Sequence, residues 1–247
     1  MDQSDTGPTA KESLVSSRLK FQQLTDSLDF GVLEYTAMNR KSIKRSRLSP
    51  DAVMQLAIQL AFFRKTNRFV ATYESCSTSA FKHGRTETMR PATDQTKAFV
   101  LAFLSAKPQA SNSELRQMID ACSNRHFELV KQASVGQGFD RHLFGLVHIA
   151  QKLGRKIPSL YSDETYINAN HFVLSTSTLS TDTIMLGGFG PVVPDGFGIG
   201  YNVGSERVGC TVSAYRDRRN VNDFIRCLEQ SLHDLNRIIE ETNVLKQ

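Results

Sequence analysis

Hydroxyl and charged side chains crowd into residues 72–87, where a buried element would carry apolar groups. Hydroxyls and cations placed together can bind a polar ligand, because both donate hydrogen bonds to its oxygens. A solvated loop that follows a helix would have the same composition. The stretch by itself therefore leaves a binding site and a plain loop both open.

A second cluster carries five cations within residues 39–47, directly before a predicted helix: Arg40, Lys41, Lys44, Arg45 and Arg47. Ser49 can cap that helix, Pro50 suits its first position, and Asp51 complements the positive end of its dipole. Cations and backbone donors that converge at a helix amino terminus can bind a phosphate. A solvated face or a nucleic-acid patch is the alternative for such a short run.

Cysteine and histidine spacing excludes several other chemistries. The four cysteines form no C-x-x-C pair, so we predict no zinc site, no thioredoxin-like redox motif and a reducing compartment. Cys76 and His83 could form a nucleophilic pair, although no third group is suggested to orient the histidine. His142 and His148 are interpreted as structural. The glycine-rich run at residues 187–200 does not open a helix, which argues against dinucleotide binding.

Helical periodicity predicts the elements that must position these groups. A first helix is predicted over residues 14–31. A second begins at Pro50, and its apolar stripe is Val53, Leu56, Ala57, Leu60 and Phe63. A capping box at Ser111 and Glu114 opens a third helix to about residue 130. A fourth is predicted over residues 140–153, before Gly154.

The pattern changes after Ser159. Residues 172–177 have the composition of a strand, and residues 196–215 read as a β-hairpin with its turn at Gly204 and Ser205. Asn220 caps a final helix with apolar positions at Phe224, Leu228, Leu232, Leu235 and Ile239. The sequence therefore predicts a mixed α/β chain.

Length and charge set wider limits. The chain has 247 residues, of which 40% are hydrophobic and 22% charged, enough for one large domain or two small ones. A net charge of +5 and a pI near 9.1 suit an anionic partner. No run approaches the ~20 apolar residues of a membrane-spanning helix. Residues 1–12 are predicted to be a disordered leader without the features of a secretory signal or a mitochondrial transit peptide.

Several segments carry a family resemblance. Residues 72–77 (T-Y-E-S-C-S) and 81–87 (F-K-H-G-R-T-E) resemble the T-Y-E-S-x-S…F-x-x-G-R-x-E signature of the choline/carnitine acyltransferase family. The resemblance covers about residues 40–240 and continues at residues 138–143, 174–177 and 190–201. Within the family, residues 80–88 and 174–180 look most like its mitochondrial branch that transfers palmitoyl groups.

This resemblance implies a fold and an activity. The fold would be the chloramphenicol-acetyltransferase-like α/β architecture, a mixed sheet flanked by helices, with residues 13–247 as its carboxyl-terminal part. The activity would be reversible transfer of a long-chain acyl group between carnitine and coenzyme A, which is a co-substrate and not a permanently bound cofactor. The location would be the matrix side of the mitochondrial inner membrane. Peripheral membrane association would come from a part of the family fold that these residues do not include.

The resemblance also implies residue roles. Tyr73, Ser75 and Thr86 would bind the carnitine carboxylate with electrostatic support from Arg141, and Phe189 would face the trimethylammonium group. Ser177 would contact the substrate and stabilise the tetrahedral oxyanion. The coenzyme A contacts would be Lys44, Arg45, Arg47, Ser49 and Asp51. The stretch before this basic cluster looks shorter than the family pattern by about one strand and its turn.

The sequence lacks the motif that contains the family's general base. That base is a histidine in an H-x-x-x-D-G motif, and none of the six histidines here lies in such a motif. The chain by itself is therefore expected to be inactive. One alternative is a catalytically dead binding or interaction fragment. The other, a basic nucleic-acid-binding module, depends on residues 39–47 alone, and we do not expect a nucleic-acid partner.

Overall fold

A six-stranded mixed sheet lies at the centre of the computed structural model, which describes residues 8–244 apart from 106–109, 179–180, 182 and 185. The strand order is β1-β6-β5-β4-β2-β3. The strands are β1 (Leu28–Tyr35), β2 (Thr72–Ser77), β3 (Thr86–Met89), β4 (Leu174–Thr178), β5 (Phe197–Val203) and β6 (Val208–Tyr215). Strands β2, β4 and β5 are parallel, and the other pairings are antiparallel. The predicted mixed α/β class is confirmed.

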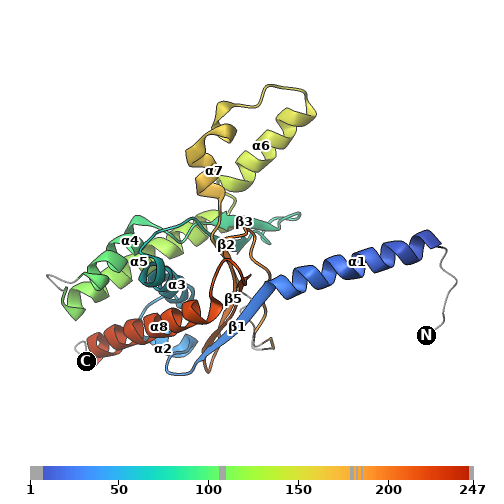
Figure 1. The fold of residues 1–247 in the computed structure, drawn as a ribbon. Coiled ribbons are helices and arrows are strands. Elements are labelled where there is room, and N and C mark those ends of the chain that lie inside the picture. The colour runs from blue at the N-terminus through green and yellow to red at the C-terminus, as the bar shows by residue number, and fades with distance from the viewer. Residues whose placement is uncertain (1–7, 106–109, 179–180, 182, 185, 245–247) are drawn as a thin grey trace.

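Helices cover mainly one face of this sheet. They are α1 (Pro8–Ser27), α2 (Arg40–Arg45), α3 (Pro50–Thr66), α4 (Asp94–Leu104), α5 (Asn112–Ser134), α6 (Asp140–Lys152), α7 (Glu164–Asn170) and α8 (Val221–Val244), with a short 3-10 turn, η1 (Ser159–Ser162). Figure 1 shows α3, α4, α5 and α8 on one side of the sheet, while α1 extends away from it and α6 and α7 project beyond the body. No helix in the described part of the chain is long and apolar enough to cross a membrane.

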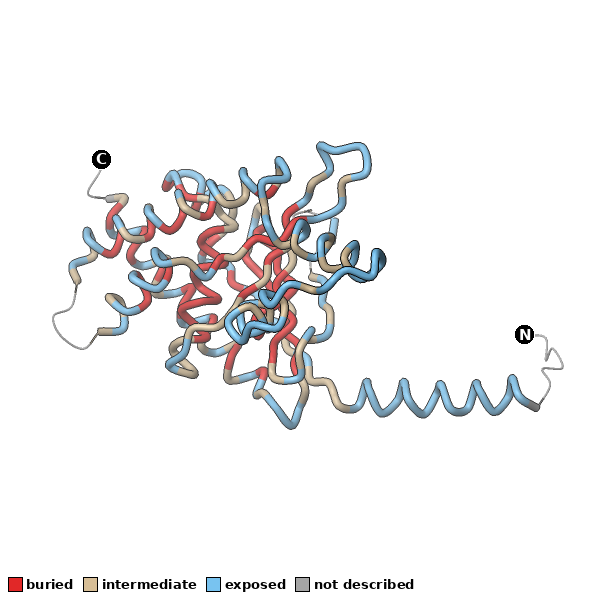
Figure 2. The backbone as a smooth tube through the Cα atoms, turned by 90° about the horizontal axis from the view of Figure 1, so that it is seen from above, coloured by how far each residue is buried: buried red, intermediate tan, exposed pale blue. Residues whose placement is uncertain are grey.

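The core lies between the sheet and α3, α5 and α8, where Figure 2 shows the buried backbone concentrated. The predicted stripe on α3 is too narrow, because every residue from 52 to 62 is buried. This helix packs against α5 and α8 as well as the sheet, so more than one of its faces is covered. The predicted positions on α8 are buried, and Asn220 caps that helix by accepting a hydrogen bond from the Asp223 amide.

The prediction for the amino-terminal region is wrong in two respects. The first helix ends at Ser27, and residues 28–35 form β1, which pairs with β6 along its length. Gly31 lies in this strand and allows α8 to approach, since a Cβ there would meet Ile225 Cδ1 at 2.4 Å. The segment before the basic cluster thus contains a strand that was not predicted. Residues 8–12 of the expected leader are helical, and residues 1–7 lie outside the described residues.

The other predicted elements occur close to their expected bounds. The third and fourth predicted helices are α5 and α6, the strand at residues 172–177 is β4, and the hairpin is β5 with β6. The Ser111 and Glu114 capping box is present. Strands β2 and β3 were not predicted, because their polar residues read equally well as a loop. They form an antiparallel pair at the sheet edge, and β2 also pairs with β4.

Candidate functional site

The two faces of β2 carry different chemistry. Thr72, Glu74 and Cys76 are buried, whereas Tyr73 and Ser75 are half-buried. Thr72 Oγ1 accepts a hydrogen bond from Gln59 on α3 at 3.0 Å, so the buried set points toward the helices. Successive side chains of a strand point to opposite faces. Tyr73 and Ser75 therefore lie on the face of the sheet opposite α3, which we call the open face.

Arg141 joins β2 to β3 on this side of the molecule. Its Nη2 donates to Tyr73 Oη at 3.3 Å and to Thr86 Oγ1 at 3.2 Å, and its Nε donates to the Thr86 carbonyl at 3.1 Å. The side chain is exposed, so a ligand can reach its remaining donor positions. The first turn of α6 is held in place by Arg90, which pairs with Asp140 at 2.5 Å. Three of the expected carnitine-binding residues are therefore in direct contact.

Ser75 and Ser177 meet where β2 and β4 run side by side. Their Oγ atoms are 3.4 Å apart. Ser177 also lines a cavity of about 130 Å³ with Phe189 and Gly200. A Cβ at Gly200 would lie 2.0 Å from the carbonyl oxygen of Gly187, so glycine is needed for the 187–189 segment to cross β5 closely. Ser177 thus contacts Ser75 and shares a cavity with Phe189, whereas Thr86 and Arg141 line a separate cavity.

The basic cluster is divided between two cavities. Arg40 and Lys44, one turn apart on α2, line a cavity of about 410 Å³ together with Asp51 and Ser75. In contrast, Arg45 and Arg47 line another of about 710 Å³ together with Arg116, Glu240 and Asn243. Of the expected coenzyme A contacts, Lys44 and Asp51 share the first cavity, and Arg45 and Arg47 share the second. Arg40 joins Lys44 and Asp51, and its spacing of four residues from Lys44 is a helical signal that the sequence offers.

Ser49 has a structural task beside this cavity. Its Oγ accepts a hydrogen bond from the Ala52 amide at 3.3 Å and so caps α3. Its own amide donates to Ser123 Oγ at 2.9 Å. The amino terminus of α3 nevertheless opens toward the cavity at Pro50 and Asp51. A helix amino terminus attracts anions, so this end adds to the effect of Arg40 and Lys44.

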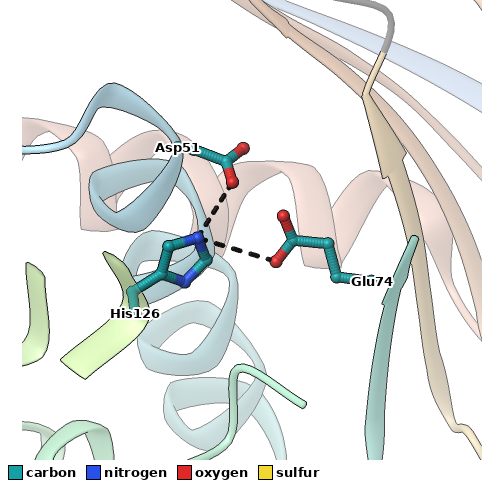
Figure 3. Close-up of side chains that lie close together, drawn as sticks. All are labelled: Asp51, Glu74 and His126. Atoms are coloured by element: carbon teal, nitrogen blue, oxygen red, sulfur yellow. Dashed lines mark hydrogen bonds and ion pairs between the residues drawn. The ribbon is translucent and has the colours of Figure 1, made fainter. Parts of the chain in front are cut away.

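A cluster formed by Asp51, Glu74 and His126 lies between α3, β2 and α5 (Figure 3), with Glu74 and His126 buried and Asp51 half-buried. His126 Nε2 lies 2.9 Å from Asp51 Oδ2 and 3.9 Å from Glu74 Oε2. Tyr201 donates to Asp51 Oδ1 and lies 3.3 Å from Glu74 Oε1. This cluster was not predicted, because its members lie far apart in the chain.

The pKa values of the two carboxyl groups in the cluster are shifted in opposite directions. Burial alone would raise the pKa of Asp51, but its hydrogen bonds with His126, Glu74 and Tyr201 lower that pKa to about 2. Burial, and then the charge of Asp51, raise the pKa of Glu74 well above its usual value. We predicted no metal site, yet Asp51, Glu74 and His126 offer ligand atoms within 4.8 Å of one another, a spacing that could hold a metal ion.

The structure does not support the alternative pair of Cys76 and His83. Cys76 points toward α5, with its Sγ 3.6 Å from the Val130 carbonyl oxygen, and burial raises the pKa of its thiol. His83 lines a different cavity, of about 710 Å³, together with Thr86 and Arg141. A raised thiol pKa leaves little thiolate for nucleophilic attack.

Comparisons with known proteins agree with the motifs. The sequence model of the family described as Choline/Carnitine o-acyltransferase matches residues 4–230. The chain is 46% identical to carnitine O-palmitoyltransferase 2, mitochondrial, of Xenopus tropicalis over 231 residues, which are 94% of this chain and 35% of that protein. It is 47% identical to the Homo sapiens protein of the same name over 234 residues, 95% of this chain and 35% of that protein.

A more distant relative is choline O-acetyltransferase of Gallus gallus, 36% identical over 230 residues, which are 92% of this chain and 36% of that protein. Among solved structures, a wax ester synthase/diacylglycerol acyltransferase from Marinobacter aquaeolei gives a TM-score of 0.47 at 9% identity, covering 94% of this chain and 57% of that one. The chain spans about a third of the length of the curated relatives that it matches.

Proposed function

The chain belongs to the choline/carnitine O-acyltransferase family, and on that basis we propose that it binds carnitine and coenzyme A for reversible transfer of a long-chain acyl group between them. The palmitoyl-type substrate is supported by 47% identity to a carnitine O-palmitoyltransferase 2, against 36% to a choline O-acetyltransferase. The printed names of the palmitoyltransferase relatives support a mitochondrial location.

The contacts of Arg141 carry the carnitine half of this proposal. Carnitine has a carboxylate and a quaternary ammonium group, so its site needs hydrogen-bond donors at one end and an aromatic face at the other. Arg141 Nη2 lies 3.3 Å from Tyr73 Oη and 3.2 Å from Thr86 Oγ1 and so holds these two hydroxyls near each other. The guanidinium and the hydroxyls are together the hydrogen-bond donors for the carboxylate. Phe189 supplies a ring for the ammonium group, an attraction of about 0.5 to 2 kcal/mol.

Ser177 would act in the chemical step. Transfer of an acyl group passes through a tetrahedral intermediate whose oxyanion needs a fixed donor. Ser177 Oγ lies 3.4 Å from Ser75 Oγ and lines the cavity that contains Phe189. From this position Ser177 would donate to the oxyanion while the neighbouring residues hold carnitine.

The coenzyme A half is supported by the cavity of about 410 Å³ at the start of α3. Its cations, Arg40 and Lys44, would pair with phosphate groups, and the positive end of the α3 dipole would add to that attraction. Ser75 lines the same cavity, which therefore reaches one of the proposed carnitine-binding residues. If the phosphates of coenzyme A bind at Arg40 and Lys44, its thiol would extend toward the hydroxyl of carnitine.

Proton transfer would need a general base that these residues do not supply. None of the six histidines lies in the H-x-x-x-D-G motif of the family's general base. We propose that these residues bind both substrates but do not exchange the acyl group by themselves. Acyl transfer would occur when the histidine-bearing region of the family fold is also present.

Calorimetry on the purified chain tests this function. We expect carnitine and coenzyme A each to bind, and palmitoylcarnitine with coenzyme A to give no turnover until the histidine-bearing region of a full-length relative is added. Binding of neither ligand would overturn the proposal. Binding of both without turnover in the combined sample would identify a catalytically dead binding protein instead.

A further inference from the structure

Helix α6 begins beside the carnitine residues without a side-chain cap of its own. Figure 1 shows it leaving the body of the molecule next to β3, and its N-cap residue, Phe139, makes no capping hydrogen bond with its side chain. The first amides of a helix have no partner within the helix and need an acceptor from elsewhere. Arg141, the cation of the proposed carnitine site, lies in this first turn. Its position therefore depends on what accepts hydrogen bonds from the start of α6.

Glu87 on β3 supplies such an acceptor. Its Oε1 accepts a hydrogen bond from the Arg141 amide at 3.3 Å and another from the Thr88 amide at 2.6 Å. The residue is only 4% exposed, so water competes little for that oxygen. A carboxylate is also attracted by the positive end of the helix dipole. Glu87 thus caps α6 from a position 54 residues earlier in the chain.

The chain just before α6 leaves room for this carboxyl group. A Cβ at Gly138 would lie 2.3 Å from Glu87 Cγ and 2.7 Å from Glu87 Oε2. Atoms that are not bonded do not approach so closely, so a larger residue at position 138 would displace the Glu87 side chain. The glycine is therefore required for the contact between Glu87 and α6.

Arg141 is tied to β3 at both of its ends. Its backbone amide donates to Glu87, and its guanidinium donates to the Thr86 carbonyl at 3.1 Å and to Thr86 Oγ1 at 3.2 Å. Thr86 is exposed and Glu87 is buried, as expected for neighbours on opposite faces of a strand. A separate ion pair between Arg90 and Asp140 holds the same turn of α6. Loss of the Glu87 contact would therefore loosen Arg141 without detaching the helix.

We propose that Glu87 is a positioning residue for carnitine binding. By capping α6 it fixes the backbone of Arg141, and so fixes where the guanidinium meets the carboxylate of carnitine. This inference deepens the proposed function and rests on it for the identity of the ligand. The negative charge of Glu87 acts in the other direction, because it repels a carboxylate bound nearby. The acceptor atom of Glu87, not its charge, is therefore what supports carnitine binding.

Two variants separate the acceptor atom from the charge. Glu87→Ala removes both, and we expect it to raise the Kd for carnitine about three- to tenfold, the effect of losing a helix cap. Glu87→Gln keeps a carbonyl oxygen without the charge, so its carnitine Kd should equal that of the unaltered chain or be lower. The Kd for coenzyme A should not change in either variant, because Arg40 and Lys44 line a different cavity from Glu87. A carnitine Kd that Glu87→Ala leaves unchanged would overturn the proposal, as would an equal increase in both variants.

A double variant tests whether Glu87 acts through Arg141. With Arg141→Gln already present the guanidinium is gone, so adding Glu87→Ala should raise the carnitine Kd no further. Independent contributions from the two residues would instead multiply, and that result would refute the positioning role. Glu164→Ala is the matched control, because Glu164 is an exposed acid in the first turn of α7 and should leave both affinities unchanged.

Hydrogen exchange measures the same contact without a ligand. In the full chain, the Arg141 amide should exchange faster in Glu87→Ala than in the unaltered chain or in Glu87→Gln, while amides in the middle of α3 stay protected. Equal exchange of the Arg141 amide in all three proteins would overturn the proposal. If Glu87→Ala does not fold, Gly138→Ala serves in its place, because it displaces the carboxyl group without removing it. If carnitine does not bind the unaltered chain but the Arg141 amide responds to Glu87→Ala, the proposed function fails and the cap on α6 remains.

Discussion

Replacement of Arg141 with glutamine removes a cation that contacts both Tyr73 and Thr86. A hydrogen bond to a charged group contributes about 1.5 to 3 kcal/mol. Because the Arg141 side chain is exposed, solvent screening favours the lower end of that range. A loss of about 1.5 kcal/mol corresponds to a roughly tenfold increase in the Kd for carnitine.

Calorimetric titration of carnitine into the unaltered chain and into Arg141→Gln measures this difference in Kd. The Kd for coenzyme A should stay the same, because Arg40 and Lys44 line a cavity that does not include Arg141. Arg155→Gln is a suitable control, since it removes an exposed arginine shortly after α6 and should leave both affinities unchanged. A carnitine Kd for Arg141→Gln equal to that of the unaltered chain would refute the supporting role assigned to Arg141.

Three other changes have defined outcomes. Arg40→Gln combined with Lys44→Gln should weaken coenzyme A binding about tenfold or more by calorimetry, while Arg45→Gln, which faces the other cavity, should change it little; equal effects would contradict the division of the cluster. Gly31→Ala should lower the free energy of unfolding by about 1 to 3 kcal/mol in denaturant titrations, because its Cβ would overlap Ile225, and an unchanged midpoint would argue against this packing. The lowered pKa of Asp51 stabilises the fold above its ordinary value of 3.8, and this contribution of about 2 kcal/mol is lost as the pH falls to about 2; Asp51→Asn should therefore show a shallower acid loss of stability, and a parallel acid limb would count against it.

Periodic apolar patterns explain why much of the fold was predictable. The α8 positions from Phe224 to Ile239 follow helical spacing and are buried as predicted. The hairpin of β5 and β6 was indicated by its composition and its turn, although every residue of β5 is buried, not alternate ones. β1 was missed because its pairing with β6 is a long-range contact, which overrides the helical spacing of Leu24 and Leu28.

The site was only partly predictable for a related reason. The motif around Tyr73 and Thr86 could be read because its residues are close in sequence. The division of the basic cluster depends on how α2 is oriented, which its short sequence does not reveal. The approach of His126 to both Asp51 and Glu74 depends on the packing of three elements, so no local pattern indicates it.

A structure of the chain with carnitine bound tests most directly whether Tyr73, Thr86 and Ser177 contact one carnitine molecule. We expect the carboxylate of carnitine to lie within about 2.7 to 3.2 Å of Tyr73 Oη and Thr86 Oγ1, on the open face of the sheet, with its hydroxyl toward Ser177. Carnitine bound at a surface that includes neither Tyr73 nor Ser177 would contradict the account.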